Sequence, residues 1–207
     1  MSDIQDRELH EFFAYVVRVL EQLEIPYMVV GGFAATTYGV PRLTIDVDVV
    51  VDMHLKQVRS LVAAFPEPDY YISEDSVRDS LVRRYPFNII DSNTAAKVDI
   101  VPMPRDPFTL AAFNRRRRIV YDTEGHSAVF ITAEDIVVAK LLAHRATESE
   151  KHLRDAQGVV MMRWDSLDMK SIRRMCQEAG LADLLTDVLE AVRRDIDGSS
   201  DQRRGPD

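Results

Sequence analysis

The pattern of apolar residues changes near Thr132, and this change limits the folds open to the chain. Before it, short runs rich in β-branched residues alternate with stretches of helical periodicity, which indicates a mixed region. After it, every segment has helical spacing. The chain has 207 residues, against a typical domain size of about 150. We therefore expect an α+β fold: a mixed sheet flanked by helices over 1–131, an all-helical domain over 132–195 and a disordered tail over 196–207.

The expected elements follow from apolar spacing and from the positions of Gly and Pro. Strands are predicted over 27–30, 44–52, 70–72, 87–90 and 97–101, with a hairpin of 119–121 and 128–131. Helices are predicted over 8–23, 33–38, 54–65, 75–84, 133–145, 150–163, 167–179 and 181–194.

Charge and cysteine content exclude several classes of protein. The net charge of −8 argues against sequence-independent nucleic-acid binding, which normally uses a basic surface. The single cysteine, Cys176, excludes an intrachain disulfide, and no Cys/His cluster has zinc-site spacing. The acidic N-terminus does not resemble a signal peptide, and no apolar run reaches the roughly 18 residues of a membrane span. These features predict a soluble, cytoplasmic protein without membrane contact.

Two aspartates in one predicted strand are the strongest chemical feature of the sequence. Asp46 and Asp48 are separated by one residue, so they project from the same face of the strand. Two carboxylates that close repel each other unless a cation lies between them, and Mg²⁺ prefers such oxygen ligands. If the strand over 97–101 pairs beside this one, Asp99 supplies a third carboxylate. The alternative is that these aspartates lie on a solvated strand face.

Candidate phosphate-binding residues precede the two aspartates. Gly31 and Gly32 lie between an apolar strand and a short helix, where backbone amides can hold phosphate, although such a pair is often only a turn. Arg42 and Thr44 share the parity of Asp46, so they face the same cleft if the strand extends that far. Arg42 is then either a phosphate contact or a surface arginine.

A dense basic run stands out in this acidic chain: Arg115, Arg116, Arg117 and Arg118. In a strand, alternate arginines face opposite sides, so at most two reach one ligand. The run can bind RNA or a triphosphate, or it can be a solvated charged segment.

Taken together, these stretches resemble the DNA polymerase beta-like nucleotidyltransferase superfamily. The similarity is carried by Val30-Gly31-Gly32-Phe33-Ala34, by the segment 39–51 with its Asp-Val-Asp, and by Lys97-Val98-Asp99-Ile100. The segment 132–145 followed by Arg154-Asp155 is also similar to small bacterial members near the AbiEii-type toxins. The similarity covers roughly residues 8–180. One departure is the second glycine, which stands where the Gly-Ser form has a serine hydroxyl.

The resemblance implies a Mg²⁺-dependent enzyme, with Mn²⁺ as an alternative, that moves an NMP from an NTP such as ATP to a hydroxyl acceptor and releases pyrophosphate. It implies Asp46, Asp48 and Asp99 as catalytic metal ligands, and Gly31 and Gly32 as contacts of the β- and γ-phosphates. The acceptor is an antibiotic, a tRNA or a protein. A toxin would imply a cognate antitoxin.

The later helices add a lysine and an aspartate to this interpretation. Lys140 is the only cation within a largely apolar helix, so it either extends to solvent or meets an anion. The resemblance suggests that this anion is the triphosphate, in which case Lys140→Met should leave stability unchanged or raise it. Asp155 is either a proton acceptor or an ion-pair partner of Lys151, four residues earlier.

Two other functional classes compete with the enzyme. A nucleotide-binding partner or antitoxin of the same fold would bind nucleotide without turnover. An RNA-binding module would use the arginine run, need no metal, and bind more weakly as salt rises.

Overall fold

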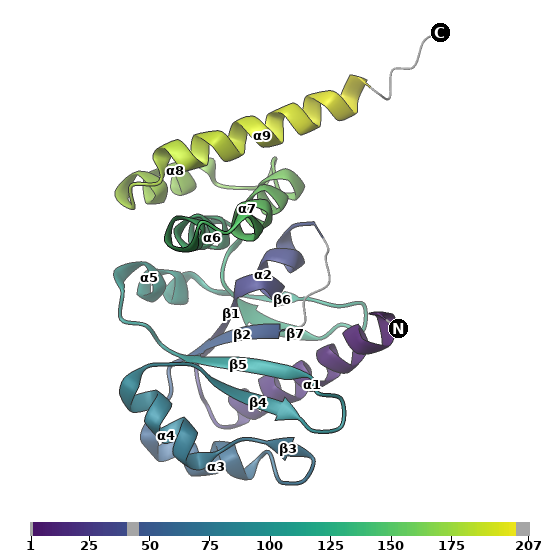
Figure 1. The fold of residues 1–207 in the computed structure, drawn as a ribbon, viewed down its shortest axis with the longest axis vertical. Helices are drawn as coiled ribbons and strands as arrows, with labels where there is room; N and C mark the ends of the chain where they lie inside the picture. The colour runs from purple at the N-terminus through teal and green to yellow at the C-terminus, as the bar shows by residue number, and fades with distance from the viewer. Residues whose placement is uncertain (1, 41–45, 202–207) are drawn as a thin grey trace. The chain divides into compact units, whose positions relative to one another are not determined.

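The computed structural model describes residues 2–40 and 46–201 of the chain, and Figure 1 shows their fold. The chain divides into two compact units, Met1–Phe33 with Leu43–Thr132, and Ala34–Arg42 with Ala133–Asp207. The strands that the structure describes all lie in the first unit, and the elements described in the second are helices. The predicted α+β class, with a mixed sheet, flanking helices and a helical C-terminal region, is therefore confirmed.

In the part of the first unit that the structure describes, the strands form a 7-stranded mixed sheet in the order β3-β4-β5-β2-β1-β7-β6. Strand β2 lies between β1, with which it is antiparallel, and β5, with which it is parallel. A strand is present at each predicted position, including the hairpin. Strand β1 has its predicted bounds, β3 to β7 begin and end within two residues of theirs, and residues 44 and 45 of the predicted second strand lie outside the described residues. Their bounds are β1 Tyr27–Val30, β2 Asp46–Val51, β3 Tyr70–Tyr71, β4 Phe87–Asp91, β5 Lys97–Pro102, β6 Arg117–Val120 and β7 Ser127–Phe130.

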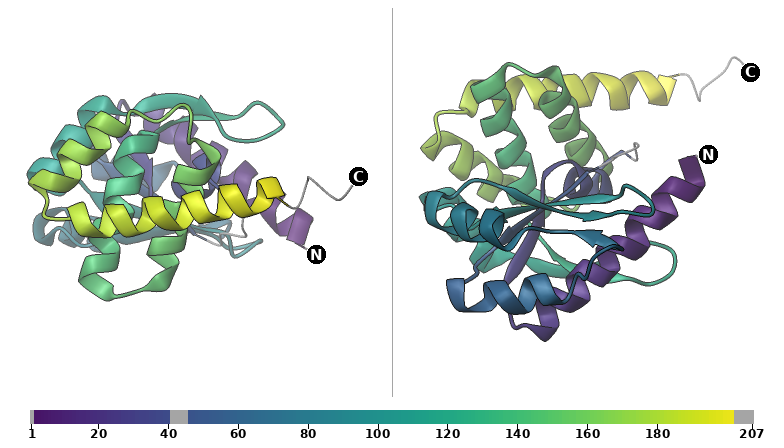
Figure 2. Two further views of the ribbon diagram at one scale, coloured as in Figure 1. Left: turned by 90° about the horizontal axis from the view of Figure 1, so that it is seen from above. Right: turned by 60° about the horizontal axis from the view of Figure 1, so that its bottom comes forward.

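The helices of the first unit supply the other side of its core. They are α1 Ser2–Gln22, the 3-10 turn η1 Leu55–Gln57, α3 Val58–Ala63, α4 Glu74–Arg83 and α5 Pro107–Arg115. Helix α1 contacts β5 and β7, and Figure 2 shows it running across the sheet. Phe13, Val16 and Leu20 on α1 are buried, as their three- and four-residue spacing predicts.

Helix α5 was not predicted from the sequence. Its start has a clear local cause, because the Asp106 side chain accepts a hydrogen bond from the Thr109 backbone N–H at 2.8 Å and Pro107 occupies the first turn. An aspartate N-cap followed by proline is a recognised start signal. Apolar periodicity over this short stretch is weak by comparison.

The second unit packs its helices against one another. They are α6 Ala133–Thr147, α7 Glu150–Met162, α8 Met169–Glu178, α9 Ala182–Asp201 and the part of α2 (Gly31–Tyr38) from Ala34 onward. Helix α6 packs on α7 and α8, and both of these contact α9. The structure differs from the prediction of a tail beginning at 196, because α9 continues as helix through Asp201. Ile196 is half-buried and extends the stripe of Val188 and Val192. Residues 202–207 lie outside the described part.

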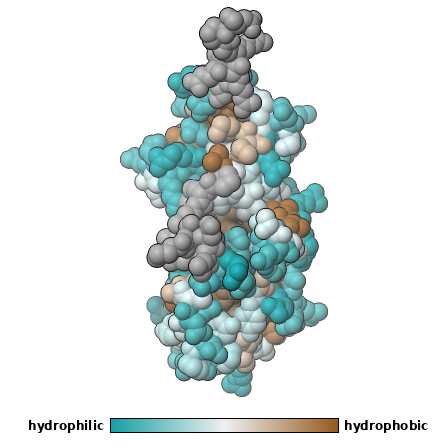
Figure 3. Space-filling model, turned by 90° about the vertical axis from the view of Figure 1, so that its right-hand side faces the viewer, coloured by the Kyte–Doolittle hydropathy of each residue, from teal (hydrophilic) through white to brown (hydrophobic). Residues whose placement is uncertain are grey.

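Figure 3 shows one face of the molecule, on which most of the described surface is hydrophilic and the hydrophobic side chains are scattered. Among the helices that the structure describes, none combines the length and the apolar character needed to cross a membrane.

Candidate active site

The pairing of β2 with β5 brings the three predicted carboxylates onto one face of the sheet. In the parallel register, Asp48 lies opposite Asp99 and Asp46 lies opposite Lys97. Side chains that are paired across strands, and those two residues apart along a strand, point to the same face. Val47 and Val49 face the other way and are fully buried, which fixes the direction of Asp46 and Asp48, the residues that alternate with them.

Lys97 joins two of these carboxylates. Its Nζ lies 3.0 Å from Asp99 Oδ2 and 3.4 Å from Asp46 Oδ1. The pKa of Lys97 is raised, chiefly by the hydrogen bond to Asp99 and in part by the charges of both aspartates. The ammonium therefore stays charged and compensates part of the negative charge on this face.

Asn88 on β4 holds the other oxygen of Asp99. The two residues lie opposite each other in the β4–β5 ladder. With the amide oriented so that its donors face acceptors, the Asn88 nitrogen donates to Asp99 Oδ1 at 2.8 Å and to the Phe87 carbonyl at 3.3 Å. Asp99 thus has a donor on each carboxylate oxygen.

The carboxylate face has the right donor chemistry for a hard divalent cation, because its oxygens come from three aspartates on adjacent strands. Within residues 2–40 and 46–201, however, no group of three or more His, Cys, Asp or Glu side chains is arranged as a metal site. Two of the three aspartates contact Lys97 instead. The three aspartates are therefore of the residue type that binds a divalent cation, but cation binding would require the Lys97 ammonium to move away.

Position 31 requires a glycine, because the Asp48 carboxylate lies against its backbone. Its φ of +71° is a conformation that L side chains rarely adopt, and a Cβ at this position would lie 1.9 Å from Asp48 Oδ2. The Asp48 carboxylate therefore lies directly against the backbone where β1 ends and α2 begins. Gly32 follows in the first turn of α2, which begins at Gly31 and not at Phe33 as predicted. Arg42 and Thr44 lie outside the described residues.

The predicted residues of the second unit form a buried ion pair with each other. Lys140 Nζ lies 2.7 Å from Asp155 Oδ2, and the two side chains are 6% and 5% exposed. The anion at Lys140 is thus a carboxylate of the neighbouring helix α7. His152 lies nearby, and its pKa is lowered by burial and then by the positive charge of Lys140. The sequence placed these groups on two helices but could not show that they meet.

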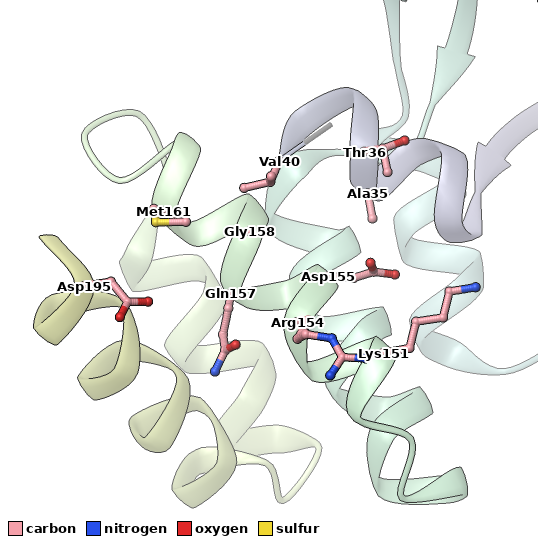
Figure 4. Close-up of a pocket in the computed structure, with 10 residues that line it drawn as sticks. All are labelled: Ala35, Thr36, Val40, Lys151, Arg154, Asp155, Gln157, Gly158, Met161 and Asp195. Atoms are coloured by element: carbon pink, nitrogen blue, oxygen red, sulfur yellow. The ribbon is translucent and has the colours of Figure 1, made fainter. Parts of the chain in front are cut away.

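A pocket of about 420 Å³ opens beside Asp155 in the second unit (Figure 4). Its walls come from α2, α7 and α9 and from Val40. Figure 4 shows Asp155 pointing toward the α2 residues Ala35 and Thr36, and Lys151 and Arg154 extending from the same helix as Asp155. The pocket combines an apolar wall with charged side chains of both signs.

The arginine run is divided between helix and strand. Arg116 stacks over the Phe113 ring, with its guanidinium carbon 3.9 Å from the ring centre, and Arg118 forms an ion pair with Glu21 at 2.5 Å. Arg115 and Arg117 are exposed. Arg116 and Arg118 therefore have intramolecular partners.

Sequence reasoning missed two members of the carboxylate cluster, Lys97 and Asn88. Lys97 shares the parity of Asp99, so the period of a strand already places both on one face. Asn88 carried no signal of this kind, because its contact depends on which strand pairs with β5.

Comparisons with known proteins yield structural similarity only. No family model and no curated protein matches the chain. Among solved structures, the antibiotic-resistance factor ANT(2'')-Ia is 11% identical with a TM-score of 0.49, covering 96% of this chain and 100% of that chain. JHP933 from Helicobacter pylori is 15% identical with a TM-score of 0.41, covering 97% and 98%. A CCA-adding enzyme in complex with ATP is 13% identical with a TM-score of 0.38, covering 83% and 48%.

Proposed function

We propose that this chain is a divalent-cation-dependent nucleotidyltransferase, which moves an NMP from an NTP to a hydroxyl acceptor and releases pyrophosphate. The observation that carries the proposal is the β2–β5 register, which sets Asp48 opposite Asp99 on the face that also bears Asp46. The contact of Gly31 with the Asp48 carboxylate supports it, because this contact places the backbone of the Gly31-Gly32 turn directly beside the acidic cluster.

In the proposed reaction, the acceptor oxygen forms a bond to the α-phosphorus while the bond from that phosphorus to the bridging oxygen breaks. Asp46, Asp48 and Asp99 would hold the cation, Mg²⁺ or Mn²⁺, which when bound supplies Lewis-acid stabilisation of the phosphate charge. Asp99 would also orient the acceptor hydroxyl. The N–H groups of Gly31 and Gly32 would donate to the β- and γ-phosphates, which leave as pyrophosphate.

Four further residues belong to the proposal. Lys140 would neutralise phosphate charge and Asp155 would accept the acceptor's proton. Because these two side chains pair at 2.7 Å, each role requires that ion pair to open. Arg42 and Thr44 remain proposed phosphate contacts. RNA contact through the run 115–118 and a cognate antitoxin also remain predictions.

The carboxylate variants Asp46→Asn and Asp48→Asn test the proposal. An amide cannot hold a divalent cation as a carboxylate does, so each variant should lose NMP transfer while its circular dichroism spectrum stays unchanged. Asp52→Asn is the matched control, since Asp52 is exposed immediately after β2. The assay incubates each labelled NTP with protein, Mg²⁺ and a cell extract, and follows pyrophosphate release and the labelled product. Wild-type transfer by Asp46→Asn or Asp48→Asn under limiting Mg²⁺ would contradict the metal assignment.

A catalytically silent nucleotide-binding partner or antitoxin is the second candidate. Lys97 favours it, because an ammonium that contacts Asp46 and Asp99 compensates them without a metal. This candidate predicts saturable NTP binding without pyrophosphate release. Comparing NTP affinity by calorimetry with pyrophosphate release on the same sample distinguishes the two functions.

A further inference from the structure

We propose that Lys97 is a resident counterion of the carboxylate cluster, which competes with a divalent cation for Asp46 and Asp99 and so weakens cation binding. This inference rests on the proposed function in one respect, namely that a cation binds these aspartates. It adds a residue that sets the affinity of the site.

The position of Lys97 supports competition. Its ammonium is 3.0 Å from Asp99 Oδ2 and 3.4 Å from Asp46 Oδ1, so it contacts two oxygens that a cation would need. A cation and an ammonium cannot occupy the same place, and each repels the other. Binding of the cation therefore requires Lys97 to leave.

The Lys97 side chain is partly exposed, so its ammonium can move away from the two carboxylates at little cost in free energy. The side chains of Lys97, Asp99 and Asp46 are 31%, 19% and 51% exposed. Because the ammonium ends a flexible four-carbon chain that already reaches solvent, it can rotate outward without leaving a buried, unpaired charge. Separating the buried pair of Lys140 with Asp155 would cost more free energy, since both of its side chains are almost fully buried.

Asn88 keeps Asp99 in place during this exchange. Its amide donates to Asp99 Oδ1 at 2.8 Å, whereas Lys97 contacts Oδ2. Asp99 thus has one partner that is part of the adjacent strand β4 and one that can be exchanged. When Lys97 rotates away, the freed Oδ2 remains oriented for a cation.

Charge gives the direction of the expected effect. Asp46, Asp48 and Asp99 carry three negative charges and Lys97 one positive charge, which leaves two negative charges on this face. Lys97→Met restores the third negative charge and removes the competitor, with a side chain of similar length. The variant should therefore bind Mn²⁺ about tenfold more tightly than the wild type.

The experiment measures free Mn²⁺ by electron paramagnetic resonance in titrations without nucleotide, so its readout is independent of activity. The proteins are wild type, Lys97→Met, Lys97→Arg and the control Lys56→Met, which removes an exposed lysine from η1. Lys97→Arg keeps the positive charge and should bind Mn²⁺ like the wild type, as should Lys56→Met. Adding Asp99→Asn to Lys97→Met should abolish the gain. Lys97→Gln replaces Lys97→Met if the latter does not fold.

The possible results separate this inference from the proposed function. Competition is supported if Lys97→Met binds Mn²⁺ more tightly than the wild type while Lys97→Arg and Lys56→Met do not. This includes the case in which wild-type binding is too weak to detect. Equal saturable binding by wild type and Lys97→Met refutes competition and leaves the metal requirement intact. Absence of saturable binding in both proteins overturns the inference together with the metal requirement of the proposed function.

Discussion

Replacing Lys140 by Met removes one charge from the buried ion pair of the second unit. Lys140 Nζ lies 2.7 Å from Asp155 Oδ2, and both side chains are almost fully buried. At this separation and an effective dielectric constant of about 20, the Coulomb attraction is about 6 kcal/mol, and desolvation of the two ions offsets much of it. The single variant nevertheless leaves Asp155 charged, buried and without this partner. We expect the free energy of unfolding to fall by about 3–5 kcal/mol.

This expected loss of stability differs from the expectation from the sequence. There, the partner of Lys140 was a triphosphate, so Lys140→Met left stability unchanged or raised it. The double variant Lys140→Met/Asp155→Leu provides the decisive comparison. Because it replaces both ions by apolar side chains, its stability should return to the wild-type value or exceed it by up to about 4 kcal/mol.

Urea unfolding followed by fluorescence measures these changes where they occur, since the only tryptophan of the chain, Trp164, belongs to the second unit. Lys151→Met is the matched control, because Lys151 is exposed on the same helix as Asp155 and should change stability by less than about 0.5 kcal/mol. The reasoning is refuted if Lys140→Met costs no more than this control, or if the double variant is no more stable than Lys140→Met.

Three further predictions concern other parts of the chain. Gly125→Ala, at φ +87° with open space around it, should lower the free energy of unfolding by about 1–2 kcal/mol. Gly31→Ala should lower it by about 1–3 kcal/mol more, because its Cβ would overlap the Asp48 carboxylate. Urea unfolding compares the two variants, and equal losses of stability would contradict the overlap. Burial alone would raise the pKa of Asp122, but hydrogen bonds from the side chain and backbone of His126 lower it. Stability from ionised Asp122 is therefore present above about pH 4 and is lost as pH falls through its folded pKa. Urea midpoints between about pH 3 and 5 should then fall more steeply for wild type than for Asp122→Asn, and parallel curves would exclude this contribution. Cys176 is fully buried, and this burial raises the pKa of its thiol to about 11. A thiol reagent at neutral pH should therefore modify Cys176 only after denaturant is added. Rapid modification of the folded protein would contradict its burial.

Much of the fold follows from local sequence signals. The period of two in β2 places Asp46 and Asp48 on one face and Val47 and Val49 on the other, and that pattern holds whichever strand lies alongside. Helix α1 is likewise indicated by its own apolar spacing. The start of α5, by contrast, depends on a single capped turn. Helix α9 extends beyond the predicted end at residue 194, because the half-buried Ile196 continues the apolar stripe of the helix.

The sequence by itself determined which groups could carry chemistry and which of them share a face, because those properties depend on side-chain type and on the period of one element. The tertiary structure decided which groups meet. Asp99 and Asp48 lie 51 positions apart, since 99 − 48 = 51, and only the register of β5 against β2 sets them opposite each other. The same register brings Lys97 to Asp46, and the packing of α6 on α7 gives Lys140 a carboxylate partner. Such pairings depend on how separate elements bury their apolar faces together, and no local pattern of the chain encodes that choice.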